Sequence, residues 1–369
     1  MDVVVVGAGL AGLQCAKSLA SRGVKVVLID RKPSVADGIQ TTGIFVRKTW
    51  EDFPLPVEQL GPAIREVILF SPKRRAMKLV APHDEFRVAR MPWILVSMLD
   101  QCARAGVRWM PSTTFMNADE RGVIVKRNGK TEHIDADFVV GADGPRSRVA
   151  EAFGLDRNHE FLVGVEDVVA SRGGSPSLRC FLDPRLAPGY IGWVADDGGE
   201  AHVGVAGYRD RFDPLQSLAT LRAEIGCGRA IERRGGLIPV NGILRRIGSR
   251  RALLVGDAAG AVSPLTAGGI DGAFRLSTFA ADVIVNATID QYSGDLFRPR
   301  FISRQWMRRA LATLAQPLFV EAACALLRTP PLRAIAEHVF FARGSFPDCA
   351  RPEPIGERRL AVLRGQIGD

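Results

Sequence analysis

The sequence lacks the paired cysteines that zinc, iron–sulfur and dithiol sites require. Its six cysteines are scattered along 369 residues, and no two of them form a C-x-x-C pair. We therefore expect no metal site and no dithiol redox centre. Cys15 and Cys102 lie in apolar helical stretches, where a thiol is a small core side chain.

Long hydrophobic runs are also missing. The longest late apolar stretch, residues 318–327, is interrupted by Glu321, so we expect no membrane-spanning helix. The first strand is expected to begin at residue 2, which leaves no room for a signal peptide. Together with the scattered cysteines, these features predict a protein of the reducing cytoplasm.

Lysine is absent after Lys130, and the net charge of +9 comes almost wholly from arginine. The late arginines either form a solvated surface or attract anionic lipid headgroups or phosphorylated substrates. No known nucleic-acid motif is present, so a nucleic-acid partner is not expected. The late arginines are Arg298, Arg300, Arg304, Arg308 and Arg309.

The first thirty residues carry a dinucleotide-binding pattern. A β-branched run at residues 3–6 leads into Gly7-Ala8-Gly9-Leu10-Ala11-Gly12, an apolar-faced helix, a second strand at residues 24–29 and Asp30. The glycines permit a tight turn, a close approach to a pyrophosphate and close helix–strand packing. The helix start offers free N–H groups to phosphates, and Asp30 can accept hydrogen bonds from a ribose diol.

Two further strand-to-turn patterns follow. Residues 138–148 combine an apolar strand, the Asp143-Gly144 turn and a basic helix start, and residues 252–270 run from an apolar strand through Asp257 to glycines. Alone, each could be a plain turn. In this order and spacing, the three patterns resemble the FAD-binding signature of the p-hydroxybenzoate-hydroxylase-type flavoproteins, over residues 1–50, 90–155 and 245–290.

This resemblance implies that FAD is bound non-covalently. Asp257 would hold the ribitol, Arg90 the linking region and Phe115 the adenine through its backbone, while Asp143 would brace the fold near the pyrophosphate. The amides of residues 268–270 would face the flavin pyrimidine edge, where a helix N-terminus stabilises the negative charge of reduced flavin. The implied cofactor residues are Gly7, Ala8, Gly9, Leu10, Ala11, Gly12, Asp30, Arg31, Thr42, Gly43, Arg90, Phe115, Asp143, Asp257, Gly268, Gly269 and Ile270.

A second G-x-G-x-x-G pattern is absent, so no separate nicotinamide domain is expected. This argues against an enzyme of the disulfide-reductase type, which has separate FAD and NAD domains. NAD(P)H or another reductant would then bind only transiently as the electron donor.

Within this superfamily, residues 255–269 and 188–194 resemble the geranylgeranyl reductase family. The second segment is similar to the aromatic strand that lines the family's substrate pocket, although core packing of these aromatic residues is the structural alternative. The pocket candidates that the resemblance implies are Thr42, Tyr190, Trp193 and Pro264.

The sequence departs from the family in ways that bear on its chemistry. Residues three apart on a strand face opposite sides, so we expect only one of Tyr190 and Trp193 to face a pocket unless a bulge at Gly192 turns the chain. The family's cysteine near the flavin is replaced in residues 41–43. A threonine hydroxyl is a poor acid, so water or a substrate group would have to supply the proton.

The alternation of patterns predicts an α/β fold with a Rossmann-type FAD-binding domain, an inserted antiparallel-sheet substrate domain and a helical C-terminal tail. The FAD-binding domain would comprise residues 1–64, 90–160 and 240–297. The substrate domain would comprise 65–89 and 161–239, with residues 65–70, 76–80 and 86–89 as an antiparallel meander. Residues 298–369 would form the helical region.

The C-terminal region contains an apolar helical stripe with arginines off it. The stripe either packs on the body of the enzyme, or it shelters an isoprenoid tail or touches a bilayer. The residues of the stripe are Ile302, Trp306, Met307, Ala310, Leu311 and Leu314.

These observations predict an FAD-dependent oxidoreductase. By its resemblance to geranylgeranyl reductases, it would reduce double bonds of a small lipophilic substrate, isoprenoid or polycyclic. The alternative is an FAD-dependent monooxygenase that hydroxylates or epoxidises a similar compound, since both classes share the three FAD patterns. A flavin halogenase is disfavoured because no W-x-W-x-I-P sequence is present.

Overall fold

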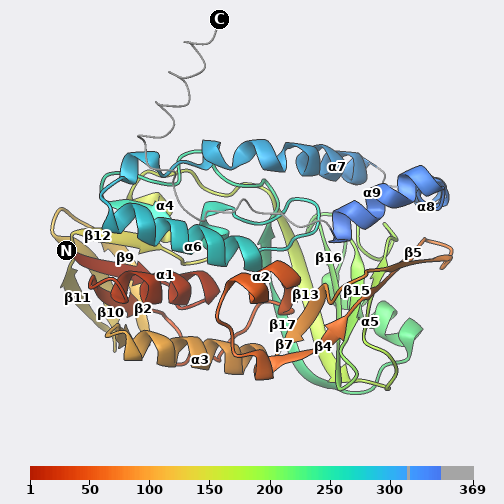
Figure 1. The fold of residues 1–369 in the computed structure, drawn as a ribbon, viewed down its shortest axis with the longest axis horizontal. Helices are drawn as coiled ribbons and strands as arrows, with labels where there is room; N and C mark the ends of the chain where they lie inside the picture. Colours follow the sequence, from red (N-terminus) through yellow and green to blue (C-terminus); the bar gives the residue numbers. More distant parts are fainter. Residues whose placement is uncertain (314–315, 342–369) are drawn as a thin grey trace, which may run out of the picture.

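The computed structural model describes residues 1–313 and 316–341 of the chain (Figure 1). Its strands are β1 (Asp2–Val6), β2 (Lys25–Ile29), β3 (Ile44–Val46), β4 (Leu60–Ile64), β5 (Glu66–Phe70), β6 (Ala76–Val80), β7 (Phe86–Ala89), β8 (Arg108–Met110), β9 (Thr113–Ala118), β10 (Gly122–Arg127), β11 (Lys130–Asp135), β12 (Phe138–Gly141), β13 (Phe161–Ala170), β14 (Ser177–Phe181), β15 (Gly192–Asp196), β16 (Glu200–Gly207), β17 (Ala230–Pro239) and β18 (Ala252–Leu254). Its α-helices are α1 (Leu10–Ala20), α2 (Arg47–Asp52), α3 (Met91–Arg104), α4 (Arg148–Ala152), α5 (Pro214–Ile225), α6 (Ile270–Val285), α7 (Ile302–Thr313), α8 (Pro317–Leu327) and α9 (Pro330–Phe341). Short 3₁₀ turns are η1 (Val57–Gln59), η2 (Gly256–Ala259), η3 (Ile289–Gln291), η4 (Gly294–Leu296) and η5 (Arg298–Phe301).

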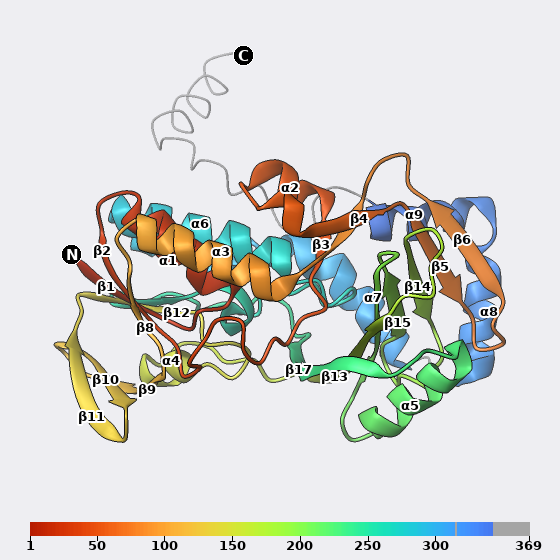
Figure 2. The ribbon, with the colours of Figure 1, turned by 90° about the horizontal axis from the view of Figure 1, so that it is seen from below.

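The N-terminal half is built on a parallel five-stranded sheet of order β18-β12-β1-β2-β8. The valines of the central strand β1 are buried, as expected of a parallel strand that is covered on both faces. Helices α1, α3 and α6 cover one face, and the small sheet β9–β11 lies on the other side (Figure 2). The Rossmann-type architecture predicted from the sequence is confirmed.

The glycines of the first turn allow α1 to start very close to β1. An ideal Cβ on Gly12 would lie 1.8 Å from the carbonyl oxygen of Gly7, so no side chain fits there. Gly7 itself has a φ of +103°, which favours glycine. On its far side α1 packs against α6, where the Ser277 hydroxyl donates to the Ala11 carbonyl oxygen at 2.9 Å.

The hairpin expected across Asn128-Gly129 is confirmed. Strands β10 and β11 pair in antiparallel register, and both turn residues have positive φ values. The buried strand expected at residues 138–141 is also confirmed as β12, parallel to β1.

The second half is a seven-stranded sheet of order β17-β13-β16-β15-β14-β5-β6. Its pairs are antiparallel except that β5 runs parallel to β14. The predicted meander is therefore wrong for its third strand, because β7 pairs with β3 and β4 in a separate sheet. The alternation of apolar residues identified the three strands, but it could not show that β7 pairs with β3 and β4. The sheet β3-β7-β4 takes strands from both sides of the domain boundary predicted at residues 64–65.

The C-terminal helices lie along one side of the molecule, with α8 and α9 beside the seven-stranded sheet (Figures 1 and 2). Of the two alternatives left open for the apolar stripe, packing on the body does not hold for Ile302 and Trp306 of α7, although Met307 of the same stripe is half-buried. Ile302 and Trp306 are exposed, whereas Arg308 is buried. The side chains of Leu311 and Leu314, and residues 342–369 of the predicted helical region, lie outside the described residues. None of the helices in the described ranges is long and apolar enough to cross a membrane.

We expect Gly12→Ala to lower the free energy of unfolding of the FAD-free protein by about 3 kcal/mol, because the added methyl group would overlap the Gly7 carbonyl. Urea denaturation measures this difference. Gly9→Ala is the matched control, since nothing lies within 4 Å of an ideal Cβ on Gly9. Equal losses in the two variants would contradict the close approach.

Candidate functional site

A cavity of about 720 Å³ extends from the glycine-rich turn to the C-terminal helices. Its size is typical of a site for a large organic ligand. One end is lined by α1, the loop after β18 and the start of α6, and the other by the seven-stranded sheet, α8 and α9. The two halves of the molecule therefore share a single cavity.

Two helix N-termini face this cavity. Gly9, Leu10 and Ala11 line it at the start of α1, where the cap residue is a glycine with no side chain. Residues 268–270 line it at the start of α6. Helix N-termini offer unpaired N–H groups and the positive end of the dipole, so they suit phosphate groups and a negatively charged ring.

Asp257 follows β18 and also lines the cavity. Among the described residues, no side chain or amide donates a hydrogen bond to its carboxylate, although its backbone carbonyl accepts one from Asn158 at 2.8 Å. Burial raises the pKa of the Asp257 carboxyl to about 6. A carboxylate of this kind suits the hydroxyl groups of a sugar alcohol. With the two helix N-termini, it forms a set of donors and acceptors that fits FAD.

Other implied cofactor residues brace the turns around the cavity. The Asp30 carboxylate accepts the Ala8 amide at 2.7 Å and the Lys32 amide at 2.9 Å, which ties the glycine-rich turn to the end of β2. The Asp143 carboxylate accepts the Ser147 hydroxyl at 2.6 Å. Burial raises the pKa of Asp143, although hydrogen bonds from the loop oppose this rise.

Several implied cofactor residues do not line the cavity. Arg31 and Arg90 are exposed, and Phe115 is buried in the core, where its carbonyl oxygen accepts from Arg148 at 3.5 Å. Gly43, with a φ of +80°, packs against Met91. The cofactor roles of these residues stay predictions. The implied residues outside the cavity lining are Gly7, Ala8, Gly12, Asp30, Arg31, Gly43, Arg90, Phe115 and Asp143.

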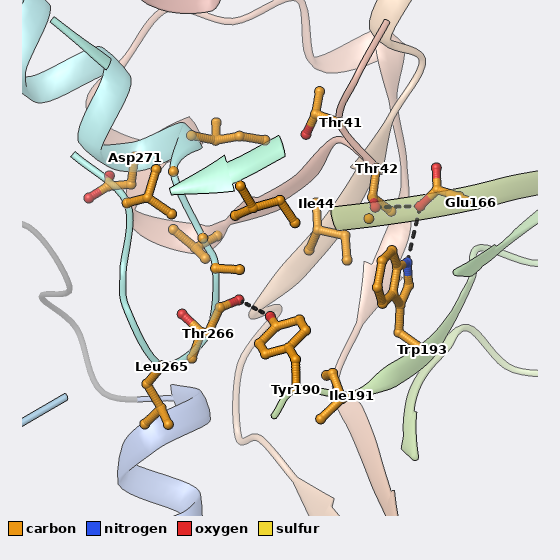
Figure 3. A pocket seen from close by; sticks show the side chains of 18 of the residues that line it. Thr41, Thr42, Ile44, Glu166, Tyr190, Ile191, Trp193, Leu265, Thr266 and Asp271 are labelled. Atoms are coloured by element: carbon orange, nitrogen blue, oxygen red, sulfur yellow. Dashed lines mark hydrogen bonds between the residues drawn. The ribbon is translucent and has the colours of Figure 1, made fainter. Parts of the chain in front are cut away.

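Both aromatic candidates, Tyr190 and Trp193, line the same cavity. The expectation that only one could do so is wrong, because Tyr190 precedes β15 in a turn closed by its amide and the Ala187 carbonyl. Strand alternation therefore does not apply to it. The Tyr190 hydroxyl donates to the Thr266 carbonyl at 2.6 Å (Figure 3). Pro264 does not line the cavity; it is buried near Gly242.

A buried carboxylate forms the centre of the cavity wall. Glu166 on β13 is 4% exposed and accepts hydrogen bonds from the Thr42 hydroxyl and from the Trp193 indole N–H at 3.0 Å (Figure 3). Its other oxygen lies 3.0 Å from His202 Nδ1 and 3.9 Å from the guanidinium of Arg234. Burial raises the pKa of Glu166, but the hydrogen bonds from His202, Thr42 and Trp193 outweigh it and hold the pKa below its usual value.

Sequence reasoning missed Glu166, His202 and Arg234. The available signal was the pair Glu166-Asp167 at the centre of an otherwise apolar strand, since buried charges need partners. Adjacent strand residues face opposite sides. Glu166 accordingly lines the cavity, while Asp167 pairs with Arg222 and Arg233 on the other face.

The far end of the cavity is mostly aliphatic and aromatic. The side chains from α8 and α9 that line it include no charged residue among those described. From α7, Met307 and Arg304 also line the cavity, and Arg304 donates to the Ser263 hydroxyl at 3.3 Å. The lining residues of α8 and α9 are Val320, Leu327, Ile335, Ala336, Val339, Phe340 and Phe341.

Comparisons with known proteins give a consistent result. Residues 1–172 match the family model described as pyridine nucleotide-disulphide oxidoreductase. The chain is 30% identical to digeranylgeranylglycerophospholipid reductase 2 of Methanosphaera stadtmanae over 322 residues, which cover 78% of this chain and 79% of that protein. It is also 30% identical to digeranylgeranylglycerophospholipid reductase 1 of Methanopyrus kandleri over 321 residues, which cover 82% of this chain and 85% of that protein.

A solved structure is similar over almost the whole chain. The geranylgeranyl bacteriochlorophyll reductase-like protein of Thermoplasma acidophilum superposes with a TM-score of 0.81. The match covers 93% of this chain and 96% of that one, at 18% identity. At this identity the likeness establishes a shared fold.

We expect Asp257→Asn to weaken FAD binding by about tenfold or more, because a charged acceptor for ribitol hydroxyls is lost. Titration of the FAD-free protein with FAD measures the affinity. The same variant should stabilise the FAD-free protein at pH 7.5 by about 1–3 kcal/mol, since a carboxyl with a raised pKa destabilises the fold when ionised.

The sign of this stability effect follows from the pKa of about 6 against an ordinary value of 3.8. The cost of Asp257 ionisation is complete above pH 6 and disappears as the pH falls towards 4. The gain from Asp257→Asn, measured by urea denaturation, should therefore shrink between pH 7.5 and pH 5. A gain that is independent of pH would contradict the assignment.

Proposed function

The chain belongs to the digeranylgeranylglycerophospholipid reductase family of FAD-dependent oxidoreductases, and we propose that it reduces double bonds of a lipophilic substrate, isoprenoid or polycyclic. The observation that carries this proposal is the cavity that continues from the dinucleotide turn into an apolar end lined by α8 and α9. A long apolar chain can occupy that end while one of its double bonds reaches the flavin end.

The residues at the flavin end support this reaction. Reduced FAD supplies a hydride when it is bound. The N-terminus of α6 lines the cavity and would offer positive potential to a bound flavin ring, and Tyr190 and Trp193 line the same cavity with aromatic surface that would exclude water from it. NAD(P)H or another reductant is proposed as the electron donor that binds transiently.

A single anaerobic experiment tests the proposal. The enzyme is reduced without oxygen and mixed with candidate isoprenoids, and we expect flavin reoxidation with a gain of two hydrogens in the product. Absorbance of the flavin and mass spectrometry of the product provide the two readouts. Turnover that needs oxygen and adds one oxygen atom would instead support the monooxygenase alternative.

Contact of α8 with an anionic bilayer is the second part of the proposal. The only charged residue of α8, Glu321, is buried and accepts the Lys73 amide at 3.0 Å, with Arg75 at 3.7 Å. The outward face of the helix is therefore apolar throughout. The exposed residues of this face are Leu318, Phe319, Ala322, Ala325 and Leu326.

The inward face of the same helix supports the choice of a bilayer as the partner. Val320 and Leu327 line the cavity from inside, so a lipid could pass from the membrane to the cavity beside one short helix. Arg75 is 60% exposed next to this face, and Arg333 is exposed on α9. Such cations complement anionic headgroups.

We expect the protein to sediment with phosphatidylglycerol vesicles and more weakly with phosphatidylcholine vesicles. Leu326→Glu should weaken this binding on the order of tenfold, because a charge replaces apolar surface at the contact. Leu215→Glu is the matched control, since Leu215 is 55% exposed on α5. Vesicle binding unaffected by Leu326→Glu, or a dimer in solution that this substitution abolishes, would contradict bilayer contact through α8.

A further inference from the structure

Helix α7 carries two arginines on its inward side and two large apolar side chains on its outward side. Ile302 and Trp306 are 51% and 64% exposed. Arg308 is 2% exposed, and Arg304 is half-buried. A surface helix ordinarily buries its apolar side chains and exposes its charged ones. For these four residues the order is reversed, so the two inward charges need a physical reason.

Arg304 lines the cavity, where its positive charge lacks a carboxylate partner. Within the described residues, its guanidinium donates a hydrogen bond to the Ser263 hydroxyl at 3.3 Å. Burial lowers the pKa of Arg304, and in the described ranges no neighbouring anion opposes this effect. A charged group that leaves water is normally paired with an opposite charge. The cavity is the side from which such a charge can reach Arg304.

The other arginines of the cavity lining are paired within the protein. Arg47 lies 3.3 Å from Glu85, and Arg234 lies 2.6 Å from Glu232. Arg304 therefore differs from them in the part of the chain that the structure describes. The carboxylates of the cavity lining, none of which forms an ion pair with Arg304 in these ranges, are Glu85, Glu166, Asp257 and Asp271.

A second cation, Arg308, lies one helical turn further along, behind the cavity wall. None of its three guanidinium nitrogens has a hydrogen-bond partner among the described residues, and the rings of Tyr190 and Tyr208 lie 5.5 Å and 5.1 Å from its Cζ. Burial raises the pKa of Tyr190, and the charge of Arg308 opposes this rise, so its field reaches a residue that lines the cavity. Like charges four residues apart on a helix repel each other, and an anion beside Arg304 would offset this repulsion.

We propose that Arg304 binds a phosphate group carried at the end of the substrate's apolar chain, with Arg308 adding positive potential behind Tyr190. This assignment rests on the proposed function and adds to it the residue that recognises the polar end of the substrate. Arg304 lines the cavity and would touch the phosphate, whereas Arg308 does not line it and acts as a positioning residue.

The chemistry of the guanidinium and of the cavity selects this ligand. A guanidinium presents a planar fork of N–H donors, which suits the paired oxygens of a phosphate or a carboxylate. The cavity also extends to α8 and α9, whose described lining residues carry no charge. A ligand that fills both regions has an anionic end and an apolar chain. A phosphate monoester carries about two negative charges near neutral pH, so it complements both cations better than a carboxylate does.

The contacts around Arg304 hold it beside the loop that leads to α6. The Ser263 hydroxyl that accepts from Arg304 also accepts the Thr266 amide at 3.3 Å. The Thr266 carbonyl accepts the Tyr190 hydroxyl, as Figure 3 shows. On α7, Gln305 donates to the Asn241 carbonyl at 2.9 Å. The phosphate end of the substrate would therefore lie beside this loop, and its apolar chain would extend towards α8 and α9.

Equilibrium dialysis of the oxidised holoenzyme tests the assignment without turnover. Farnesyl phosphate and farnesol differ only in the phosphate, and they are used without vesicles so that membrane contact cannot contribute. Wild-type enzyme should bind farnesyl phosphate about tenfold or more tightly than farnesol, because a charge-assisted hydrogen bond is added. Arg304→Ala should reduce this preference to about threefold or less, while FAD content and affinity for farnesol stay within about threefold.

Three further measurements separate recognition of the phosphate from a general effect of charge. Arg309→Ala is the matched control and should keep the wild-type preference, since Arg309 is exposed beside the Trp306 ring on the same helix and does not line the cavity. Arg304→Lys keeps the charge but loses the planar fork, so its preference should lie between those of wild type and Arg304→Ala. Raising NaCl to about 0.5 M should lower the wild-type preference by less than about threefold, because a partly buried pair is weakly screened.

Other sources of phosphate give different outcomes. Equal binding of the two ligands by wild-type enzyme, or a preference that survives in Arg304→Ala, would overturn the assignment. Inorganic phosphate that competes with farnesyl phosphate at equal concentration would overturn it as well, because the site would then take a free anion. So would an Arg304→Ala enzyme that loses affinity for NADPH in flavin reduction but keeps its preference for farnesyl phosphate. If wild-type enzyme binds neither farnesyl phosphate nor farnesol, the proposed function fails instead.

Discussion

The burial of a single carboxylate explains how the two halves of this molecule meet. A carboxylate removed from water must be surrounded by donors, and Glu166 takes them from a loop of the dinucleotide half and from three strands of the seven-stranded sheet. Thr42 and Arg234 are far apart in the sequence, yet both are fixed by this requirement. These contacts join the two halves at the cavity wall, because the carboxylate accepts hydrogen bonds from the Thr42 hydroxyl and the Trp193 indole and lies 3.0 Å from His202 Nδ1.

The opposite situation holds at Asp257, which faces the same cavity without a donor among the described residues. One carboxylate is stabilised by its own protein, and the other is available to a ligand. Perturbed carboxyls with opposite environments in one cavity are typical of a functional site. In the proposed function, the side of the cavity that Asp257 lines is the side that holds the cofactor.

Much of the fold could be predicted from the sequence, because local patterns determine it. The glycine-rich turn, the Asn128-Gly129 hairpin and the buried strand β12 all depend on neighbouring residues. The partners of β7 could not be predicted, since they depend on which distant strands bury its side chains.

The candidate site was predicted unevenly for the same reason. Asp257 and residues 268–270 belong to the strand-to-turn pattern of residues 252–270, so the sequence identified them as candidates that line the cavity. Glu166 and His202 lie on different strands, and no local sequence pattern indicates that they are in contact. The position of Tyr190 was misjudged because the strand begins two residues later than its apolar sequence suggests. Helical periodicity predicts that Arg308 lies on the exposed face of α7. It is buried instead, because the rings of Tyr190 and Tyr208 cover its guanidinium.

The order of strands in the two sheets also has a consequence for biosynthesis. β5 pairs with β14, and β12 pairs with β18. In each sheet, one strand is therefore synthesised long before the strand that it pairs with. At ordinary rates of translation, the β5–β6 hairpin spends on the order of ten seconds with an open edge before β14 leaves the ribosome. Unpaired edges of this kind favour misassembly. We therefore expect the growing chain to need protection of these edges until β14 and β18 have been made.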